Sequence, residues 1–131
     1  MPNLRSLDIS GCSTVYLMGP TAQPLEQLDA NDMSLIDRYI SDIIRNHGGT
    51  LRRLGIAGCQ MTRRGAAQIA STLANLQSLD ISGCRTLSDA DFKVFASLGE
   101  TLRFLNLSAT KVSNDTVDLL EVALPNCEIV H

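Results

Sequence analysis

The sequence predicts an α/β solenoid: a curved right-handed superhelix of βα units, with parallel strands on the concave face and helices on the convex face. Two nearly identical segments support this prediction. Residues 4–12 read LRSLDISGC and residues 76–84 read LQSLDISGC, which differ at one position in nine. Both fit the template L-x-x-L-x-L-x-x-C, and further copies of the template follow at regular intervals. A fixed internal period of this length is the sequence signature of a stacked repeat architecture.

Copies of the template start near residues 4, 25, 51, 76, 102 and 127, at intervals of 21, 26, 25, 26 and 25 residues. The copy at 51 is complete, the copy at 102 ends in Thr110, the copy at 25 is weaker, and the last, Cys127–Val130, is partial. We expect residues 1–131 to form a single domain. Because internal-looking repeats stand at both ends, where a solenoid normally carries a capping repeat, we expect it to be part of a larger protein or assembly.

The spacing of the template follows from strand geometry. Alternate side chains of the central L-x-L segment face opposite sides of the sheet. Positions one, four and six therefore point into the solenoid, and positions three, five and seven point to the concave face. The ninth position lies where the chain leaves the strand. This tight interior site suits a small group that can bond to nearby backbone, such as Asn, Thr or a thiol.

The segments that return to the next strand are predicted to be helical. Thr62, Ser88 and Ser113 follow the ninth position by three or four residues and are good N-cap residues. The apolar residues after each of them recur with the rhythm of a one-sided helix. Residues 36–46 show the same pattern, with Asp32, Ser34 or Asp37 as the cap. The segment 13–24 is short and proline-rich, and we interpret it as an extended crossover whose Val15, Tyr16 and Leu17 cover the core.

Composition agrees with a folded domain that has an aliphatic core. Apolar residues make up 44 %, charged residues 19 % and aromatic residues 4 %, and the net charge of −3 gives no field that draws nucleic acid. No run approaches the length of about 18 apolar residues needed to span a membrane. The N-terminal residues lack the pattern of a secretion signal. We therefore expect an intracellular, cytoplasmic protein without membrane insertion, with a nuclear or organellar location left open.

The four cysteines are predicted to be structural thiols. Their number would allow two disulfides, but Cys12, Cys59 and Cys84 share the ninth template position, and Cys127 begins the last copy. An interior position in an intracellular protein indicates reduced, buried thiols. No C-x-x-C pair or histidine accompanies them, since His47 and His131 lie elsewhere. We therefore expect no metal.

Motifs that support catalysis are missing from the sequence. It contains no phosphate-binding loop, no G-x-G-x-x-G segment and no nucleophile elbow with a histidine nearby. We expect no enzymatic activity, no cofactor and no small-molecule substrate.

The L-x-x-L-x-I-x-G-C runs that end at Cys12, Cys59 and Cys84 resemble cysteine-containing leucine-rich repeats, the type found behind F-box motifs and in ribonuclease-inhibitor-like solenoids. The resemblance covers nearly the whole chain and is specific for fold. It implies a recognition or scaffold module, in some relatives one that selects substrates for ubiquitin ligases. No F-box-like stretch of three helices precedes the first repeat in this sequence.

The concave face is the first candidate for a binding surface. The fifth-position residues form a column that holds three carboxylates, which could bind basic groups of a partner or could be there only because Asp is small and soluble. Phe104 could anchor a partner or could pack against a neighbouring element. The concave candidates are Asp8, Asp29, Arg53, Asp80, Phe104 and Asn106.

A basic rim is the second candidate. Arg63 and Arg64 follow the cap Thr62 and occupy a first helical turn, where the helix dipole disfavours cations. With Arg85 and Lys111 in the corresponding loops, they could bind an acidic or phosphorylated partner. The alternative is that these are ordinary solvated charges.

Three functions follow from these patterns. The first is a non-catalytic scaffold or adaptor that binds protein partners within a multi-subunit intracellular complex. The second is the substrate-recognition arm of an F-box-type ubiquitin ligase adaptor. The third is a nucleic-acid-associated module that uses the basic rim, and the acidic concave column counts against it.

Overall fold

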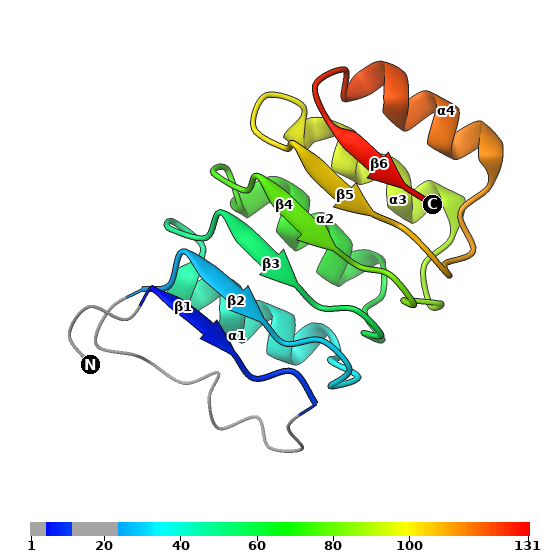
Figure 1. Ribbon diagram of the computed structural model, residues 1–131. Coiled ribbons are helices and arrows are strands. Elements are labelled where there is room, and N and C mark those ends of the chain that lie inside the picture. The colour runs from blue at the N-terminus through cyan, green and yellow to red at the C-terminus, as the bar shows by residue number, and fades with distance from the viewer. Residues whose placement is uncertain (1–4, 12–23) are drawn as a thin grey trace.

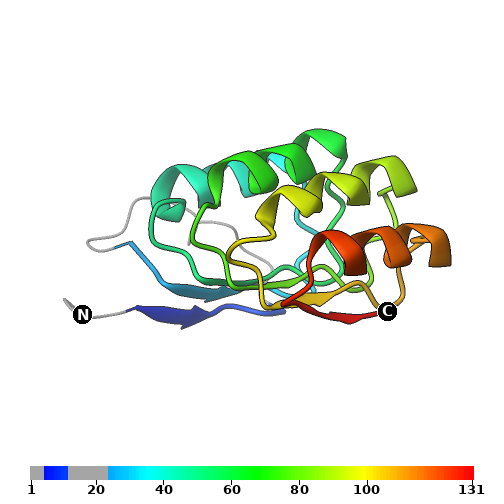
Figure 2. The same ribbon diagram turned by 90° about the horizontal axis from the view of Figure 1, so that it is seen from above.

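The computed structural model describes residues 5–11 and 24–131, and it has one layer of strands and one layer of helices (Figures 1 and 2). Six parallel strands stand side by side in chain order, and each pairs with the next. The strands are β1 (Ser6–Asp8), β2 (Gln27–Asp29), β3 (Arg53–Gly55), β4 (Ser78–Asp80), β5 (Phe104–Asn106) and β6 (Glu128–Val130). Alternating strands and helices with an open parallel sheet make an α/β solenoid, as the repeats predicted.

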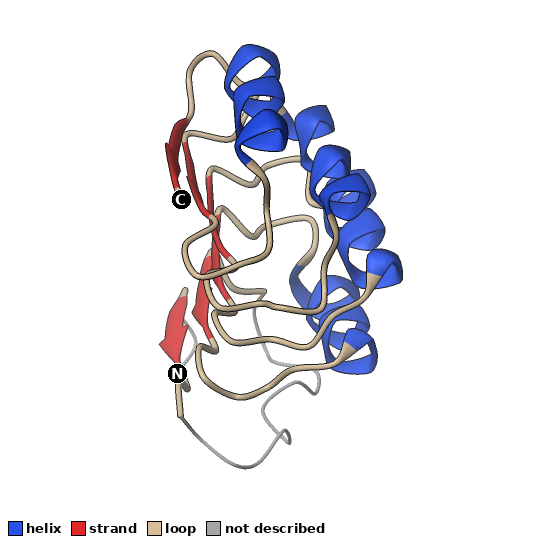
Figure 3. Ribbon diagram, turned by 90° about the vertical axis from the view of Figure 1, so that its right-hand side faces the viewer, coloured by secondary structure: helices blue, strands red, loops and turns tan. Residues whose placement is uncertain are grey.

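The helices all lie on one face of the sheet (Figure 3). They are α1 (Asp37–His47), α2 (Arg63–Thr72), α3 (Asp89–Phe92) with the 3₁₀ helix η2 (Lys93–Leu98), and α4 (Asn114–Ala123). The expected crossover at 13–24 lies almost entirely outside the described residues.

The core fills the space between the two layers, and the template positions line it as predicted. Leu28, Leu54, Leu79 and Leu105 lie at the fourth position of neighbouring repeats, directly opposite one another, and all are buried. Beside them are buried the first-position residues Leu25, Leu51, Leu76 and Leu102 and the sixth-position residues Ile9, Ala30, Ile56, Ile81 and Leu107. The helices add apolar residues from one face each, including Ile43, Ile69, Phe92, Phe95 and Leu120.

The eighth template position explains why glycine precedes cysteine in the repeats. Gly58 and Gly83 have φ angles of +74° and +72° there. A left-handed turn at this point leads the chain out of the strand, and glycine adopts it without steric cost. Asp32 and Ala109 occupy the same position in their repeats and are also left-handed, with φ angles of +62° and +58°.

Two details of the helix layer differ from the sequence prediction. Helix α1 begins at Asp37, and its N-cap residue is Ile36, whose side chain makes no cap hydrogen bond, so none of the three expected polar residues is the cap. The helix predicted after Ser88 is α-helical for four residues only and continues as a 3₁₀ helix. Phe92 and Phe95 are both fully buried. Phe92 and Phe95 are three positions apart. This spacing suits a 3₁₀ helix, in which residues i and i+3 lie above one another.

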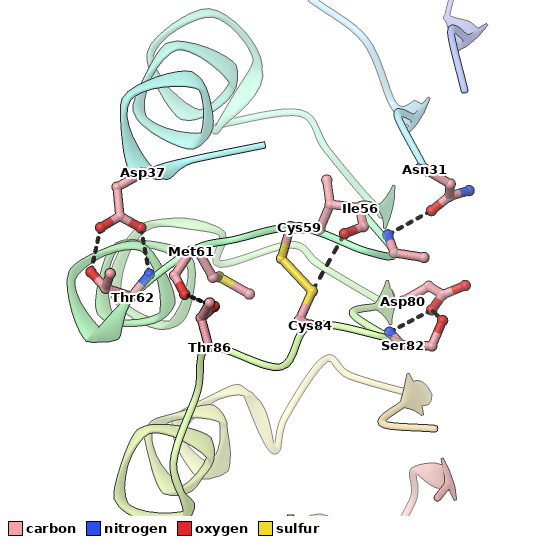
Figure 4. Close-up of a disulfide and its surroundings, with 11 residues drawn as sticks. Asn31, Asp37, Ile56, Cys59, Met61, Thr62, Asp80, Ser82, Cys84 and Thr86 are labelled. Carbon is pink, nitrogen blue, oxygen red and sulfur yellow. Dashed lines mark hydrogen bonds between the residues drawn. A yellow bond between two sulfur atoms is a disulfide. The ribbon is translucent and has the colours of Figure 1, made fainter. Parts of the chain in front are cut away.

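The cysteines also differ from the prediction. A disulfide joins Cys59 and Cys84, so the expectation of free thiols is wrong for this pair (Figure 4). Both residues are buried, at the ninth positions of adjacent repeats. Stacking places their Cα atoms 5.0 Å apart, within the range that a disulfide spans. Cys127 is free and partly buried, and Cys12 lies outside the described residues.

The last, partial repeat is one residue shorter than the template. Ile129, and not Val130, lies opposite Leu105. Val130 consequently takes the place beside Asn106, in the column of the fifth position.

Candidate partner-binding surface

Within residues 5–11 and 24–131, no helix lies on one face of the sheet (Figure 3), and we call this face the sheet face. The side chains of the third, fifth and seventh template positions belong to it. The register lines them up across neighbouring strands in columns. The third-position column is Ser6, Gln27, Arg53, Ser78 and Phe104, and the fifth-position column is Asp8, Asp29, Gly55, Asp80 and Asn106. All six concave candidates predicted from the sequence therefore lie together on this face.

Several polar side chains of the fifth position brace their own strand ends. Asp8 Oδ1 accepts a hydrogen bond from the backbone N–H of Ser10 at 2.9 Å, and this bond lowers the pKa of the Asp8 carboxyl. Asp80 Oδ1 accepts from both the N–H and the hydroxyl of Ser82 (Figure 4). Asn106 Oδ1 accepts from the N–H of Ser108. These bonds are a structural reason for Asp and Asn at this position. In Asp80 they engage one carboxylate oxygen, Oδ1.

Gly55 makes a gap in the fifth-position column. A Cβ atom built there would lie 2.7 Å from Oδ1 of Asp29 and 3.0 Å from Oδ1 of Asn31. The side chains of the preceding repeat therefore lean over the glycine. Asn31 is fixed in this place by the N–H of Ala57, which donates to its Oδ1 at 2.8 Å. As a result, Asp29 and Asp80 flank a position that has no side chain of its own.

Arginines gather where the strands begin. Arg52 and Arg103 each directly precede a strand, and Arg53 is the first residue of β3. All three are exposed. Arg52 forms a long ion pair of 3.9 Å with Glu26, which also pairs with Arg5 at 3.6 Å. Among the described residues, Arg53 has no ion pair. Phe104, two strands away from Arg53, is only partly buried and is the one aromatic residue in its column.

The basic rim is organised differently from the sequence prediction. Arg63 is not an uncompensated cation, because its Nε lies 3.1 Å from Oδ1 of Asp91 in the next repeat. The backbone explains this pairing. Asp37 and Asp89 begin their helices and accept the N–H groups of Thr62 and Ser113 in the following repeats, each at 2.8 Å.

Helix α2 begins with Arg63, which cannot accept such a bond. The N–H of Ser88 instead donates a hydrogen bond to Oδ2 of Asp91 at 2.9 Å. The Nε of Arg63 donates to Oδ1 of the same carboxylate. The Ser88 N–H is the main cause that lowers the pKa of Asp91, and Arg63 adds to it.

The rim does not form a uniformly basic surface. Arg63 and Arg64 line a shallow hollow of about 860 Å³ together with the carboxylates of Asp37 and Asp91. Arg85 and Lys111 are exposed but do not line this hollow. The structure therefore brings two of the four rim residues, Arg63 and Arg64, together beside two negatively charged residues.

A family model described as Leucine Rich repeat matches residues 72–96, which run from the end of α2 through β4 and α3 into η2. The other strand–helix units repeat the same register and buried positions, so the fold is an α/β solenoid that is consistent with leucine-rich repeats. The match does not distinguish the cysteine-containing type from other leucine-rich repeats.

Two further findings concern the part of the chain that the structure describes. None of its helices combines the length and apolar character needed to cross a lipid bilayer. The described residues of the repeats also contain no group of three or more His, Cys, Asp or Glu side chains placed to hold a metal ion.

The sequence analysis missed Arg52 and Arg103 as neighbours of the concave candidates. The repeat pattern held the signal, because both occupy the second template position and flank Gln77 in the neighbouring repeat. The cap-bridging role of Asp37, Asp89 and Asp91 was also missed. That role depends on side chains from one repeat reaching the backbone of the next, which the template does not encode.

Proposed function

We propose that this chain is a non-catalytic protein-interaction module, a scaffold or adaptor subunit that binds a partner protein on its sheet face. The observation that carries the proposal is the uncovered face of a parallel sheet. Parallel sheets are almost always covered on both faces, whereas here the described helices cover one face only (Figures 2 and 3). Leucine-rich repeats generally serve in protein binding, which agrees with this proposal.

The arrangement of charge favours the sheet face over the rim. Rim residue Arg63 is paired with Asp91, and the hollow beside it contains as many acids as arginines. The sheet face instead carries its charges in two rows. Carboxylates stand at the fifth position, where Asp8 is exposed and Asp29 and Asp80 are partly exposed. The row at the strand starts is mostly arginine, with Glu26 paired to Arg5 and Arg52. Separated rows of charge give a surface the electrostatic complementarity that fixes the orientation of a partner.

Quantitative affinity purification from the source cells, after chemical crosslinking, tests the proposal. The sheet-face variant carries Asp29→Lys with Asp80→Lys, and the control variant carries Asp115→Lys with Asp118→Lys on α4. All four residues are at least partly exposed, and both variants change the net charge equally. We expect the amount of each specific partner recovered with the sheet-face variant to fall about tenfold. The control variant should recover the same amounts as the wild type.

A different outcome would place the binding surface on the rim. In that case the partners would still bind the sheet-face variant but would be lost from the variant with Arg64→Glu and Arg85→Glu. The pairing with Asp91 engages the Nε of Arg63, one of the cations on which the nucleic-acid alternative relied. No feature of the described residues specifically favours the F-box alternative. An intracellular location also stays part of the proposal, and the redox state of Cys59 and Cys84 bears on it, because disulfides persist mainly in oxidising compartments.

A further inference from the structure

Three arginines and one aromatic ring flank two uncharged polar residues, Gln77 and Ser78, at the start of the strands. Backbone hydrogen bonds place Arg52, Gln77 and Arg103 side by side, since Gln77 N–H donates to the Arg52 carbonyl and Arg103 N–H donates to the Gln77 carbonyl, both at 2.7 Å. One residue further on, the register places Arg53, Ser78 and Phe104 side by side. We call Arg52, Arg53, Arg103 and Phe104 the arginine patch.

The spacing of the patch leaves room for a side chain from outside. Neighbouring strands lie about 4.8 Å apart, so Arg53 and Phe104 stand roughly 10 Å apart with Ser78 between them. Ser78 is short and only partly buried. It therefore forms a low floor between a guanidinium on one side and an aromatic ring on the other.

The arginines of the patch are incompletely neutralised within the chain. Arg53 has no ion pair among the described residues, and the described bond of the Arg103 guanidinium goes to the carbonyl of Glu100 at 3.4 Å. Arg52 shares Glu26 with Arg5 over distances of 3.9 Å and 3.6 Å. The nearby carboxylate of Asp80 is bonded to Ser82 through Oδ1. The guanidinium groups thus keep most of their donors available, and guanidinium groups bind carboxylates in bidentate geometry.

We propose that the arginine patch binds an acidic segment of a partner protein, in which an Asp or Glu lies next to an apolar residue. The carboxylate lies over Ser78 between Arg53 and Arg103, and the apolar residue packs on the ring of Phe104. Aromatic and arginine side chains are the residue types that most often dominate binding energy at interfaces. This inference rests on the proposed function, because it names the chemistry of the partner that occupies the sheet face.

A random peptide display library, selected on the full chain, provides the probe. We expect the selected peptides to carry Asp or Glu beside an apolar residue. Two variants separate the contributions: Arg53→Glu with Arg103→Glu reverses the charge of the patch, and Phe104→Ala removes the ring. The charge control carries Arg38→Glu with Lys93→Glu, two exposed cations outside the sheet and outside the basic rim. Thermal melting of each variant checks that the fold is intact.

Peptides selected on the wild-type chain should bind about tenfold more weakly to the charge-reversed variant. Their affinity for the charge control should be unchanged. Selection on the charge-reversed variant should yield Lys or Arg in place of the acid. A contrary outcome is that the selected peptides lose affinity for the variant with Asp29→Lys and Asp80→Lys and keep it for the patch variants. That result would overturn this inference and would still support the proposed function.

Peptides that bind equally to every variant, or a selection that enriches no peptide, would count against both the patch and the sheet face as the binding surface. A single-stranded RNA oligonucleotide that binds through Arg53 and Arg103, while no acidic peptide does, would overturn the choice of a protein partner. Each outcome therefore either supports the arginine patch or rejects it.

Discussion

At the scale of single residues, the helix-start arginines show how a local rule can be broken and compensated. Arg63 opposes the dipole of its own helix, at a cost of about 0.3–1 kcal/mol. Its pair with Asp91 offsets this cost only modestly, because 77 % of the Arg63 side chain is exposed and exposed pairs contribute about 0–1 kcal/mol. Arg63 therefore has a partner within the chain, and this pair stabilises the fold only slightly.

His47 is the residue whose protonation we expect to affect stability. It lies at the end of α1, it is 2 % exposed, and its Nδ1 accepts the N–H of Leu25 at 2.9 Å. Burial lowers the pKa of the imidazole below its ordinary value of 6.5. Protonation of Nδ1 would break this hydrogen bond and would place a positive charge in the core.

Because the folded state holds His47 neutral, the unfolded state binds more protons below about pH 6.5. The unfolding free energy should therefore be constant above that pH and should fall as the pH decreases through the range between the unfolded and folded pKa values. Urea denaturation at several pH values measures this. His47→Gln, which keeps an acceptor but does not titrate, should flatten the curve. An equally steep fall in that variant would show that another group is responsible.

At the scale of the repeat element, the turn after each strand depends on one left-handed residue. Gly58 and Gly83 adopt this conformation without strain, whereas Ala109 holds it at φ +58°. A left-handed conformation costs a non-glycine residue about 1–2 kcal/mol. Thr110, which follows, donates through Oγ1 to the carbonyl of Leu107 at 2.6 Å and helps to close the turn.

Replacing Ala109 with Gly should therefore raise the unfolding free energy by up to about 1 kcal/mol, as the strain released exceeds the added entropy of the unfolded glycine. The matched control is Ala67→Gly, the same substitution at an exposed site within α2, which should lower stability by about 1 kcal/mol. Chemical denaturation of the two variants checks the prediction. A loss of stability in both would mean that the turn carries no strain.

At the scale of the whole molecule, the disulfide ties the third repeat to the fourth. It closes a loop with a sequence separation of 25 residues, between repeats that are otherwise joined by strand pairing and helix packing. Cross-linking a loop of this size reduces the entropy of the unfolded chain and stabilises the fold by about 3 kcal/mol in the chain-entropy model.

Denatured protein that has seen no reductant should accordingly react with a thiol reagent at Cys127 and not at Cys59 or Cys84, as read by peptide mass spectrometry. Adding reductant should lower the unfolding free energy by about 3 kcal/mol. The variant with Cys59→Ala and Cys84→Ala should be insensitive to reductant. Labelling of Cys59 and Cys84 in protein isolated without reductant would instead restore the original expectation of buried free thiols.

The sequence by itself determined the strands, the buried leucine columns and the residues of the sheet face. It could do so because a solenoid repeats one local unit, and the alternation of a strand decides which side chains face the core. The glycines of the eighth position stand in the same runs, but their left-handed turn was not predicted and is seen only in the structure.

Only the tertiary structure decided how one repeat contacts the next. The disulfide between Cys59 and Cys84, the pairing of Arg63 with Asp91 and the capping of Thr62 by Asp37 all join residues about 25–28 positions apart. The short 3₁₀ helix around Phe95 and the grouping of Arg53, Arg103 and Phe104 also depend on neighbouring repeats. Such contacts are set by the stacking distance and by side chains that reach across it, which a template for a single repeat does not contain.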